Sequence, residues 1–177
     1  MSGSSDFAER PCVGCGARVA DVEGPTHRYV VASPGCWARF NELGTRWWTP
    51  AIPGASPGVQ RIAVDAYMVQ HPGLPDDTSV HRQAIQSVAV HLVGLYLSVE
   101  RNIEPVSVTK MIQRLLASPR TFPLLEPPPS LGEISILDVV GAPDARLVSQ
   151  VQVWARSSWA AWSTYHERVQ EWGDAVA

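Results

Sequence analysis

Cysteine is used sparingly in this chain, and two of the three cysteines stand almost side by side. Cys12 and Cys15 flank the dipeptide Val13-Gly14, and Cys36 follows after 20 intervening residues, in what we expect to be the first turn of a helix. Two thiolates on a glycine-containing turn can reach one Zn²⁺ ion without strain. The spacing therefore predicts a zinc site built on Cys12, Cys15 and Cys36.

A structural zinc ion needs four ligands, so one more side chain must join the three sulfurs. The residue three positions after Cys36, where a second helical ligand is usual, is Arg39, which cannot bind a cation. His71, at the end of a predicted helix, is the preferred fourth ligand, and His27 and His91 are the alternatives. The competing interpretations are that the cysteines are small buried core residues or a redox pair. A redox pair is disfavoured because this CxxC does not lie between a strand and a helix of a βαβ unit.

A second group of residues could also carry chemistry. Asp65, His91 and His166 lie on three different predicted helices, each near apolar positions. If they project inward together, they form a catalytic metal site or an acid–base pocket, as helical bundles build them. The alternative is that each histidine is a core residue with one hydrogen bond, and that Asp65 caps a loop or pairs with Arg61 or Arg82.

The elements that position these residues are mostly helical. Apolar periodicity and capping signals predict a mainly α-helical bundle of about five helices, with an N-terminal zinc-knuckle-like hairpin and at most one short β element. The predicted helices run from Ser33 or Gly35 to Leu43, over 59–70, over 80–100 with Ser79 as N-cap, over 104–117 with Ser107 as N-cap, and over 145–172. The helix over 80–100 is the most apolar and should lie centrally, and residues 134–140 read as a short strand or an extended lead into the last helix. Trp159, Trp162, His166 and Val169 should share one stripe of that last helix.

The chain organisation follows from this pattern. Residues 1–10 are polar and predict a disordered leader, and residues 11–177 predict a single helical domain. Within it, residues 11–36 form a metal-binding piece, including a short extended stretch over 27–31, that packs on the bundle. Seven tryptophans are unusual for this length, and we expect them in the core or in pocket walls.

The composition limits the classes of partner that we expect for this chain. A formal charge of −3 gives no broad positive field, so nucleic acid and anionic membrane surfaces are not expected as partners. No apolar run reaches the roughly 20 residues that cross a bilayer, and the first ten residues lack the apolar segment of a secretory signal. Cysteines without such a signal predict a cytoplasmic protein with reduced thiols.

Several short blocks, in a characteristic order from Cys12 to about Trp172, resemble an uncharacterised bacterial family catalogued as domain of unknown function 5946. These blocks are Cys12–Gly16, Pro25–His27, Ser33–Trp37, Asp65–Pro72, Gln86–Leu92 and Trp154–Trp162. The resemblance implies a single domain and adds weight to the cysteine and histidine positions, but it implies no reaction.

Three functions fit these observations. In the first, zinc is mainly structural and a pocket lined by tryptophan and histidine binds a small molecule. In the second, the protein is a small metal-dependent enzyme that uses Asp65, His91 and His166. In the third, it is an adaptor for another protein. A coordination sphere with three sulfurs favours the first function, because catalytic zinc usually has fewer thiolate ligands and keeps a bound water. The sequence leaves open whether the protein is an enzyme.

Overall fold

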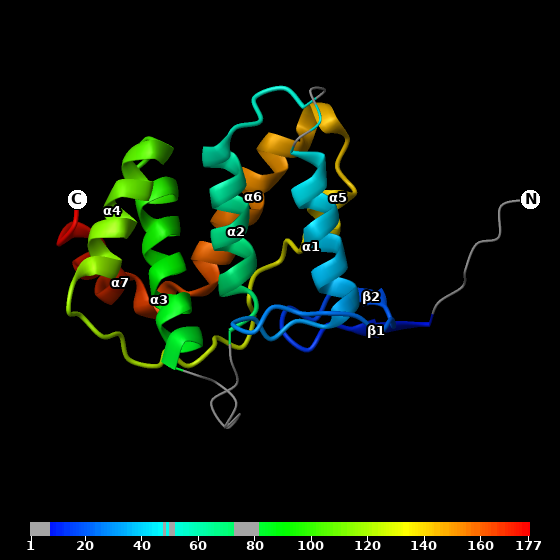
Figure 1. Ribbon diagram of the computed structural model, residues 1–177, viewed down its shortest axis with the longest axis horizontal. Helices are drawn as coiled ribbons and strands as arrows, with labels where there is room; N and C mark the ends of the chain where they lie inside the picture. The colour runs from blue at the N-terminus through cyan, green and yellow to red at the C-terminus, as the bar shows by residue number, and fades with distance from the viewer. Residues whose placement is uncertain (1–7, 48, 50–51, 73–81) are drawn as a thin grey trace, which may run out of the picture.

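The computed structural model describes residues 8–47, 49, 52–72 and 82–177. In this part of the chain it contains seven α-helices and one two-stranded hairpin, which confirms the mainly α fold class (Figure 1). The elements are β1 Glu9–Pro11, β2 Arg18–Ala20, α1 Pro34–Arg46, α2 Pro57–Val69, α3 Arg82–Leu95, the π-helical turn η1 Tyr96–Glu100, α4 Pro105–Ala117, α5 Ile136–Val140, α6 Asp144–Ala161, the 3₁₀ turn η2 Ser163–Tyr165, and α7 His166–Asp174.

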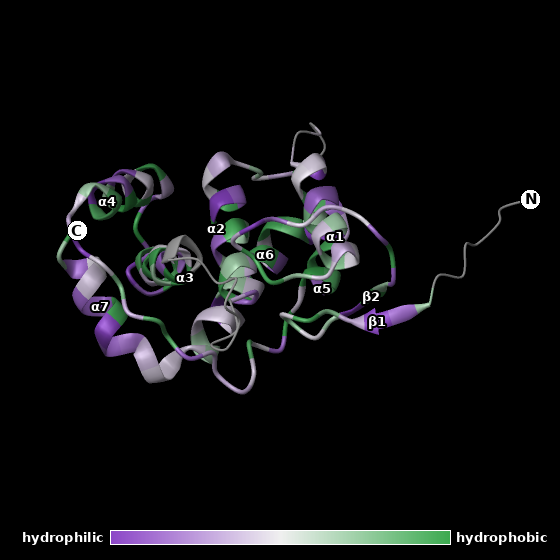
Figure 2. Ribbon diagram, turned by 60° about the horizontal axis from the view of Figure 1, so that its bottom comes forward, coloured by the Kyte–Doolittle hydropathy of each residue, from purple (hydrophilic) through white to green (hydrophobic). Residues whose placement is uncertain are grey.

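Helix α2 lies at the centre of the molecule, between α1 and α3 and in front of α6 in Figure 1. It packs most extensively against α6 and α3, whereas α1 packs against the short helix α5 and α7 packs against α3. Figure 2 shows that apolar segments of α5 and α6 lie between the other helices, while β1 is hydrophilic. The Ser56 side chain accepts a hydrogen bond from Val59 N and Pro57 occupies the first turn, so α2 begins with a regular N-terminal cap.

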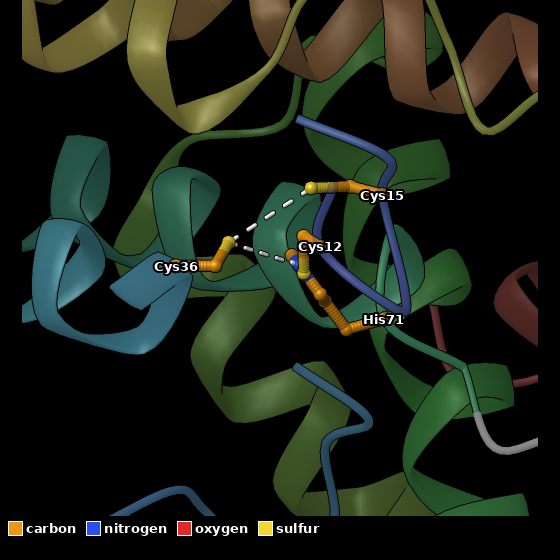
Figure 3. A group of neighbouring side chains, drawn as sticks. All are labelled: Cys12, Cys15, Cys36 and His71. Carbon is orange, nitrogen blue, oxygen red and sulfur yellow. Dashed lines mark hydrogen bonds between the residues drawn. The ribbon is translucent and has the colours of Figure 1, made fainter. Parts of the chain in front are cut away.

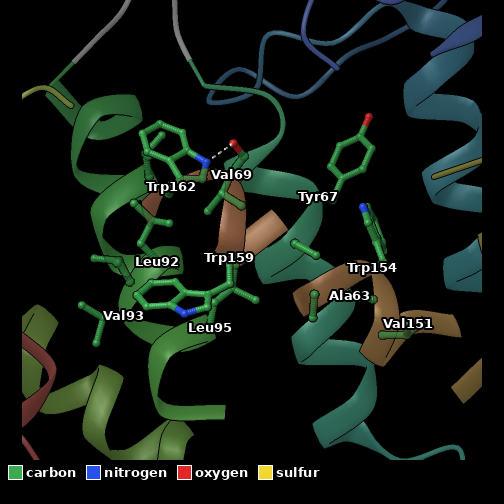
Figure 4. Close-up of a cluster of buried hydrophobic side chains, with 14 of the residues drawn as sticks. Ala63, Tyr67, Val69, Leu92, Val93, Leu95, Val151, Trp154, Trp159 and Trp162 are labelled. Carbon is green, nitrogen blue, oxygen red and sulfur yellow. Dashed lines mark hydrogen bonds between the residues drawn. The ribbon is translucent and has the colours of Figure 1, made fainter. Parts of the chain in front are cut away.

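Three tryptophans of the C-terminal region fill the core between α2, α3 and α6 (Figure 4). Trp154 and Trp162 are completely buried and Trp159 nearly so. Each indole N–H has a partner within the protein: Trp154 donates to Gln70, Trp159 to Glu100, and Trp162 to the carbonyl of Val69. These side chains therefore fill the core and hold α6 on α2. Of the two locations expected from the sequence, the core and the wall of a pocket, these three tryptophans occupy the core.

The sequence predicts one continuous last helix over 145–172. In the structure this helix breaks at Trp162. Its backbone leaves the helical region there, with φ −92° and ψ 20°, while its indole turns to the Val69 carbonyl, 3.2 Å away. The chain then makes the 3₁₀ turn and restarts as α7. The predicted stripe of Trp159, Trp162, His166 and Val169 is therefore divided between two helices that point in different directions.

Other boundaries also differ from expectation. Residues 136–140 form α5 and not a strand, because Ser135 and Asp138 make a reciprocal capping box. Helix α4 is capped by the Glu104 side chain, one turn before the predicted cap Ser107. The predicted N-cap Ser79 lies outside the described residues.

The N-terminal piece also differs in detail. Glu9 and Arg10, predicted to belong to a disordered leader, pair with β2 in the hairpin; residues 1–7 lie outside the described chain. The strands flank the CxxC turn directly, while the stretch over 27–31 is a loop without strand pairing. None of the helices that the structure describes is long and apolar enough to cross a membrane.

Candidate metal centre

Three segments that are far apart in the sequence bring four candidate ligands together. Cys12 and Cys15 lie on the turn between β1 and β2, Cys36 lies in the first turn of α1, and His71 follows the end of α2. One ligand atom from each side chain lies within 4.8 Å of all the others. Figure 3 shows the three sulfurs and the imidazole converging from these segments. The group has the composition Cys₃His and could bind a metal ion.

The hairpin gives the CxxC turn its shape. Cys12 N donates to Ala17 O at 2.8 Å and Gly16 N donates to Cys12 O at 3.0 Å, which closes the turn around the two sulfurs. Gly16 has φ 74°, a conformation that favours glycine. At Gly14 a Cβ atom would overlap the carbonyl oxygen of Val31 and lie 2.6 Å from Cδ2 of His71. A glycine at position 14 is therefore what allows the turn to approach the imidazole.

The start of α1 is fitted to the hairpin in the same way. A Cβ atom on Gly35 would overlap the carbonyl oxygen of Ala20 in β2, so only glycine lets the first helical turn lie this close. Ser33 is buried, and its hydroxyl accepts a hydrogen bond from Val13 N at 3.2 Å. Ser33 N in turn donates to Cys12 Sγ at 3.3 Å. The residues before Cys36 thus connect the helix to the CxxC turn directly.

The imidazole of His71 is held in one orientation. Its Nδ1 lies 2.7 Å from the carbonyl oxygen of Tyr67, one helical turn earlier, and its Nε2 lies 3.3 Å from Cys36 Sγ. A carbonyl can only accept, so Nδ1 carries a proton, and Nε2 is the nitrogen left to bind a metal ion. A histidine that binds a metal usually has its other nitrogen fixed in this way.

The spacing of the ligand atoms matches a tetrahedral ion. Four ligands placed about 2.3 Å from a central zinc ion have sulfurs about 3.8 Å apart, and a sulfur and a nitrogen about 3.6 Å apart. The Cys15 and Cys36 sulfurs are 3.8 Å apart, and Cys36 Sγ is 3.3 Å from His71 Nε2. These two separations are therefore close to those of a first coordination shell, and all four ligand atoms lie within 4.8 Å of one another.

Electrostatics also point to a cation. Contacts with Cys15 and Cys36 hold the pKa of Cys12 far below its usual range, and contacts with Cys12 and Cys15 raise the pKa of Cys36 far above it. Thiols this close cannot all ionise without a nearby positive charge, because each thiolate repels the next. Burial opposes the protonation of His71, but hydrogen bonds with Cys12 and Cys15 outweigh burial and raise its pKa to about 9. A divalent cation would reverse this balance and let all three thiols ionise.

The four members are those preferred from the sequence, and the two alternative histidines lie elsewhere. His27 accepts a hydrogen bond from Tyr29 N at 3.2 Å and its ring contacts Trp37. His91 pairs with Asp65. Sequence reasoning found the glycine of the CxxC turn but missed Tyr67, which also supports the group. Tyr67 donates its hydroxyl to Cys36 Sγ at 3.5 Å, and its spacing of four residues from His71 was the signal that could have revealed it.

The structure joins Asp65 and His91 but places His166 against Trp159. The carboxylate of Asp65 is buried, accepts from His91 Nδ1 at 2.7 Å, and lies 3.5 Å from Arg61 Nε. His166 stacks on Trp159, with ring centroids 3.8 Å apart, and its Nε2 lies 3.0 Å from the Trp159 carbonyl oxygen. In the described part of the chain, Asp65 and His91 thus form a hydrogen-bonded pair, and His166 belongs to a separate stacked pair with Trp159.

Fold and site together define a mainly helical protein with a Cys₃His group that could bind a metal ion. The sequence profile of a family of unknown function, DUF5946, matches residues 10–163, so the chain belongs to this family. No curated protein and no solved structure matches the chain. The matched region contains the whole Cys₃His group and the Asp65–His91 pair, whereas His166 lies beyond it.

Proposed function

We propose that Cys12, Cys15, Cys36 and His71 bind one Zn²⁺ ion and that this ion is structural. The observation that carries the proposal is the size and composition of the group: four soft or borderline donors at the separations of a tetrahedral shell. Thiolate and imidazole donors in a tetrahedral arrangement favour zinc among the common divalent ions.

A structural role follows from the number of protein ligands. Four protein donors complete a tetrahedron and leave no position for a substrate or a reactive water. Three of the four donors, Cys12, Cys36 and His71, are buried, with at most 3% of their surface exposed. The proposed ion is therefore enclosed by the protein on most sides.

The position of the group explains why the fold would need an ion. The hairpin strands have three residues each, which is too short for independent stability. The group links this hairpin to α1 and to the end of α2, and so to the tryptophan core. Because the ligands are assembled only in the folded chain, the free energy of metal binding adds to the free energy of folding.

The surrounding hydrogen bonds suit a zinc ion with three thiolates. Such a centre carries one net negative charge, which nearby donors stabilise. Ser33 N donates to Cys12 Sγ and the Tyr67 hydroxyl donates to Cys36 Sγ. The enzyme that uses Asp65, His91 and His166, the adaptor and the small-molecule site stay predictions from the sequence.

Elemental analysis of protein purified without an affinity tag tests the proposal. We expect about one zinc ion per chain, as a single tetrahedral site requires, and loss of that zinc in Cys36→Ser. His27→Ala is the matched control, since it removes a nearby histidine outside the group and should retain zinc. Wild-type protein that is free of metal, and whose melting temperature is unchanged by added zinc or by chelator, would contradict the proposal.

A further inference from the structure

The four proposed ligands differ in their access to solvent. Cys12, Cys36 and His71 are buried, whereas Cys15 is only partly buried. Cys15 lines a cavity of about 420 Å³ between the CxxC turn and the proline-rich segment 127–132. Small molecules from solvent can therefore approach the group at Cys15.

The ligands differ as well in the hydrogen bonds that their sulfurs accept. Cys12 Sγ accepts from Ser33 N and Cys36 Sγ accepts from the Tyr67 hydroxyl. Among the described residues, Cys15 Sγ contacts other members of the group, including Cys36 Sγ at 3.8 Å, and accepts no hydrogen bond from a donor outside the group. A donor that stabilises a thiolate withdraws electron density from it. Cys15 is thus the most exposed thiolate and the one least stabilised by donors, and both properties favour its reaction.

We propose that Cys15 is an oxidation site for small hydroperoxides, which reach it through this cavity, and that Cys36 then closes a disulfide with it. The inference rests on the proposed zinc site, because zinc keeps both sulfurs ionised at neutral pH. Cys36 is the partner because its sulfur is already beside Cys15 Sγ, and a move of roughly 2 Å brings the two sulfurs to bonding distance.

The reaction has two balanced steps. In the first, the Cys15 thiolate attacks one oxygen of hydrogen peroxide and the O–O bond breaks; the leaving hydroxide takes a proton from solvent, and Cys15 becomes a sulfenic acid. In the second, the Cys36 thiolate attacks the Cys15 sulfur, the S–O bond breaks, and the departing hydroxide takes a second proton. The two thiolates lose two electrons, and the peroxide is reduced to two waters.

The consequence is loss of the metal. A disulfide removes two of the four ligands, and Cys12 and His71 alone cannot complete a tetrahedral shell. The hairpin and α1 would then lose their ionic link to α2, while the tryptophan core between α2 and α6 stays intact. Oxidation at one accessible sulfur would thereby loosen the hairpin and the first turn of α1, while the rest of α1 stays packed on α5.

The test uses the full-length zinc-loaded protein and hydrogen peroxide. Zinc release is followed with a chromogenic chelator, and the cysteines are then located by peptide mass spectrometry with fragmentation between Cys12 and Cys15. We expect zinc to leave in step with formation of a Cys15–Cys36 disulfide, with Cys12 still a free thiol, and a dithiol reductant plus zinc to reverse both changes. A Cys12–Cys15 disulfide, or zinc retained at peroxide concentrations that oxidise glutathione in the same buffer, would overturn the inference.

Two variants test the route through the cavity. Ser130 is exposed and lines the cavity, so Ser130→Trp should slow zinc release several-fold without touching a ligand. Ser149→Trp, at an exposed position of α6, is the matched control and should react like the wild type. Equal rates in the two variants would overturn this route.

A second measurement needs no variant. Iodoacetamide added to the zinc-loaded protein should alkylate Cys15 before Cys12 or Cys36, and first labelling at either buried cysteine would contradict the inference. Failure of the zinc site itself is recognised separately, because the protein would then contain no metal before any peroxide is added.

Discussion

Tyr67 and His71 are joined twice, by the 2.7 Å contact between the Tyr67 carbonyl oxygen and His71 Nδ1 and by stacking of their rings with centroids 4.0 Å apart. Tyr67 lies in the last turn of α2 and His71 follows the end of that helix, so the imidazole is oriented by the helix that precedes it. The Tyr67 hydroxyl reaches past the ring to Cys36 Sγ. One tyrosine thus positions a ligand from α2 and donates to a ligand from α1.

This arrangement predicts that Tyr67→Phe weakens zinc binding. The substitution keeps the backbone carbonyl and an aromatic ring, but it removes the donor to Cys36 Sγ. Loss of an outer hydrogen bond at a metal site typically costs about 10- to 100-fold in affinity, and we expect a loss in this range. Competition with a chelator of known affinity measures it.

The control for this variant is Tyr29→Phe, which removes a tyrosine hydroxyl from the loop before α1 and should leave the affinity unchanged. Equal affinities for Tyr67→Phe and wild type would show that the hydroxyl contributes nothing to the site.

Removal of the metal should loosen one part of the molecule. After treatment with a chelator, we expect amide hydrogen exchange to accelerate most in the hairpin and the first turn of α1, because the proposed metal link between these segments and the end of α2 is lost. Exchange in α6 should change little, since Trp154 and Trp162 hold it on α2 without help from the site. Uniform acceleration over the whole chain would instead mean that the metal supports the entire core.

Zinc affinity should rise with pH, and less steeply above about 9, where His71 has lost its proton. Contacts with the neighbouring sulfurs outweigh burial and raise the pKa of His71 from 6.5 to about 9, and contacts with Cys12 and Cys15 raise that of Cys36 as well. Both groups therefore carry protons in the metal-free protein at pH 7, and zinc must displace them. Lowering the pH stabilises the protonated, metal-free state and so weakens binding.

Competition titrations between pH 6.5 and 9.5 measure this dependence, and His71→Ala should show a smaller slope because one competing proton is gone. An affinity that is constant between pH 7 and 9 would contradict the protonation of these two ligands.

The Cys₃His group was predictable from the sequence because its signals are local. Each proposed ligand can be recognised from the few residues around it. The signals are the spacing of Cys12 and Cys15, the helix start at Cys36 and the helix end at His71. The break at Trp162 was not predictable in this way. Apolar periodicity continues through it, and the break coincides with a hydrogen bond from the Trp162 indole to Val69, 93 residues away. Helix α5 is an intermediate case. The sequence contains the capping box of Ser135 and Asp138, but the apolar run over 134–140 led to the prediction of a strand or an extended segment.

The contact of Asp65 with Arg61, one helical turn away, was one of the alternatives drawn from the sequence, but its contact with His91 depends on the packing of α2 against α3, which periodicity does not specify in register. Asp65 is 1% exposed and is compensated by His91 and Arg61. Asp65→Ala removes the only carboxylate of this cluster and leaves a cationic Arg61 partly buried without its partner. Breaking a buried pair from one side costs about 3–5 kcal/mol, and we expect a loss of unfolding free energy in this range by urea denaturation.

Glu42→Ala serves as the control for Asp65→Ala. Glu42 pairs with Arg39 at 2.8 Å on the surface of α1, with both side chains about half exposed. Exposed pairs contribute only about 0–1 kcal/mol. A loss for Asp65→Ala that is no larger than the loss for Glu42→Ala would contradict the importance of the buried pair.

Gly94 in α3 is the position that admits the Asp65 carboxylate between the two helices. A Cβ atom there would overlap Asp65 Oδ2, lie 2.8 Å from Asp65 Cγ and lie 3.1 Å from a terminal nitrogen of Arg61. Gly94→Ala should therefore lower the unfolding free energy by about 1–3 kcal/mol through overpacking, although alanine is the better helix former. Gly44→Ala in α1 is the matched control, because nothing lies within 4 Å of its added Cβ; it should stabilise the protein by up to about 1 kcal/mol. Effects of the same sign in the two variants would show that helix propensity, and not the space around Asp65, decides the outcome at position 94.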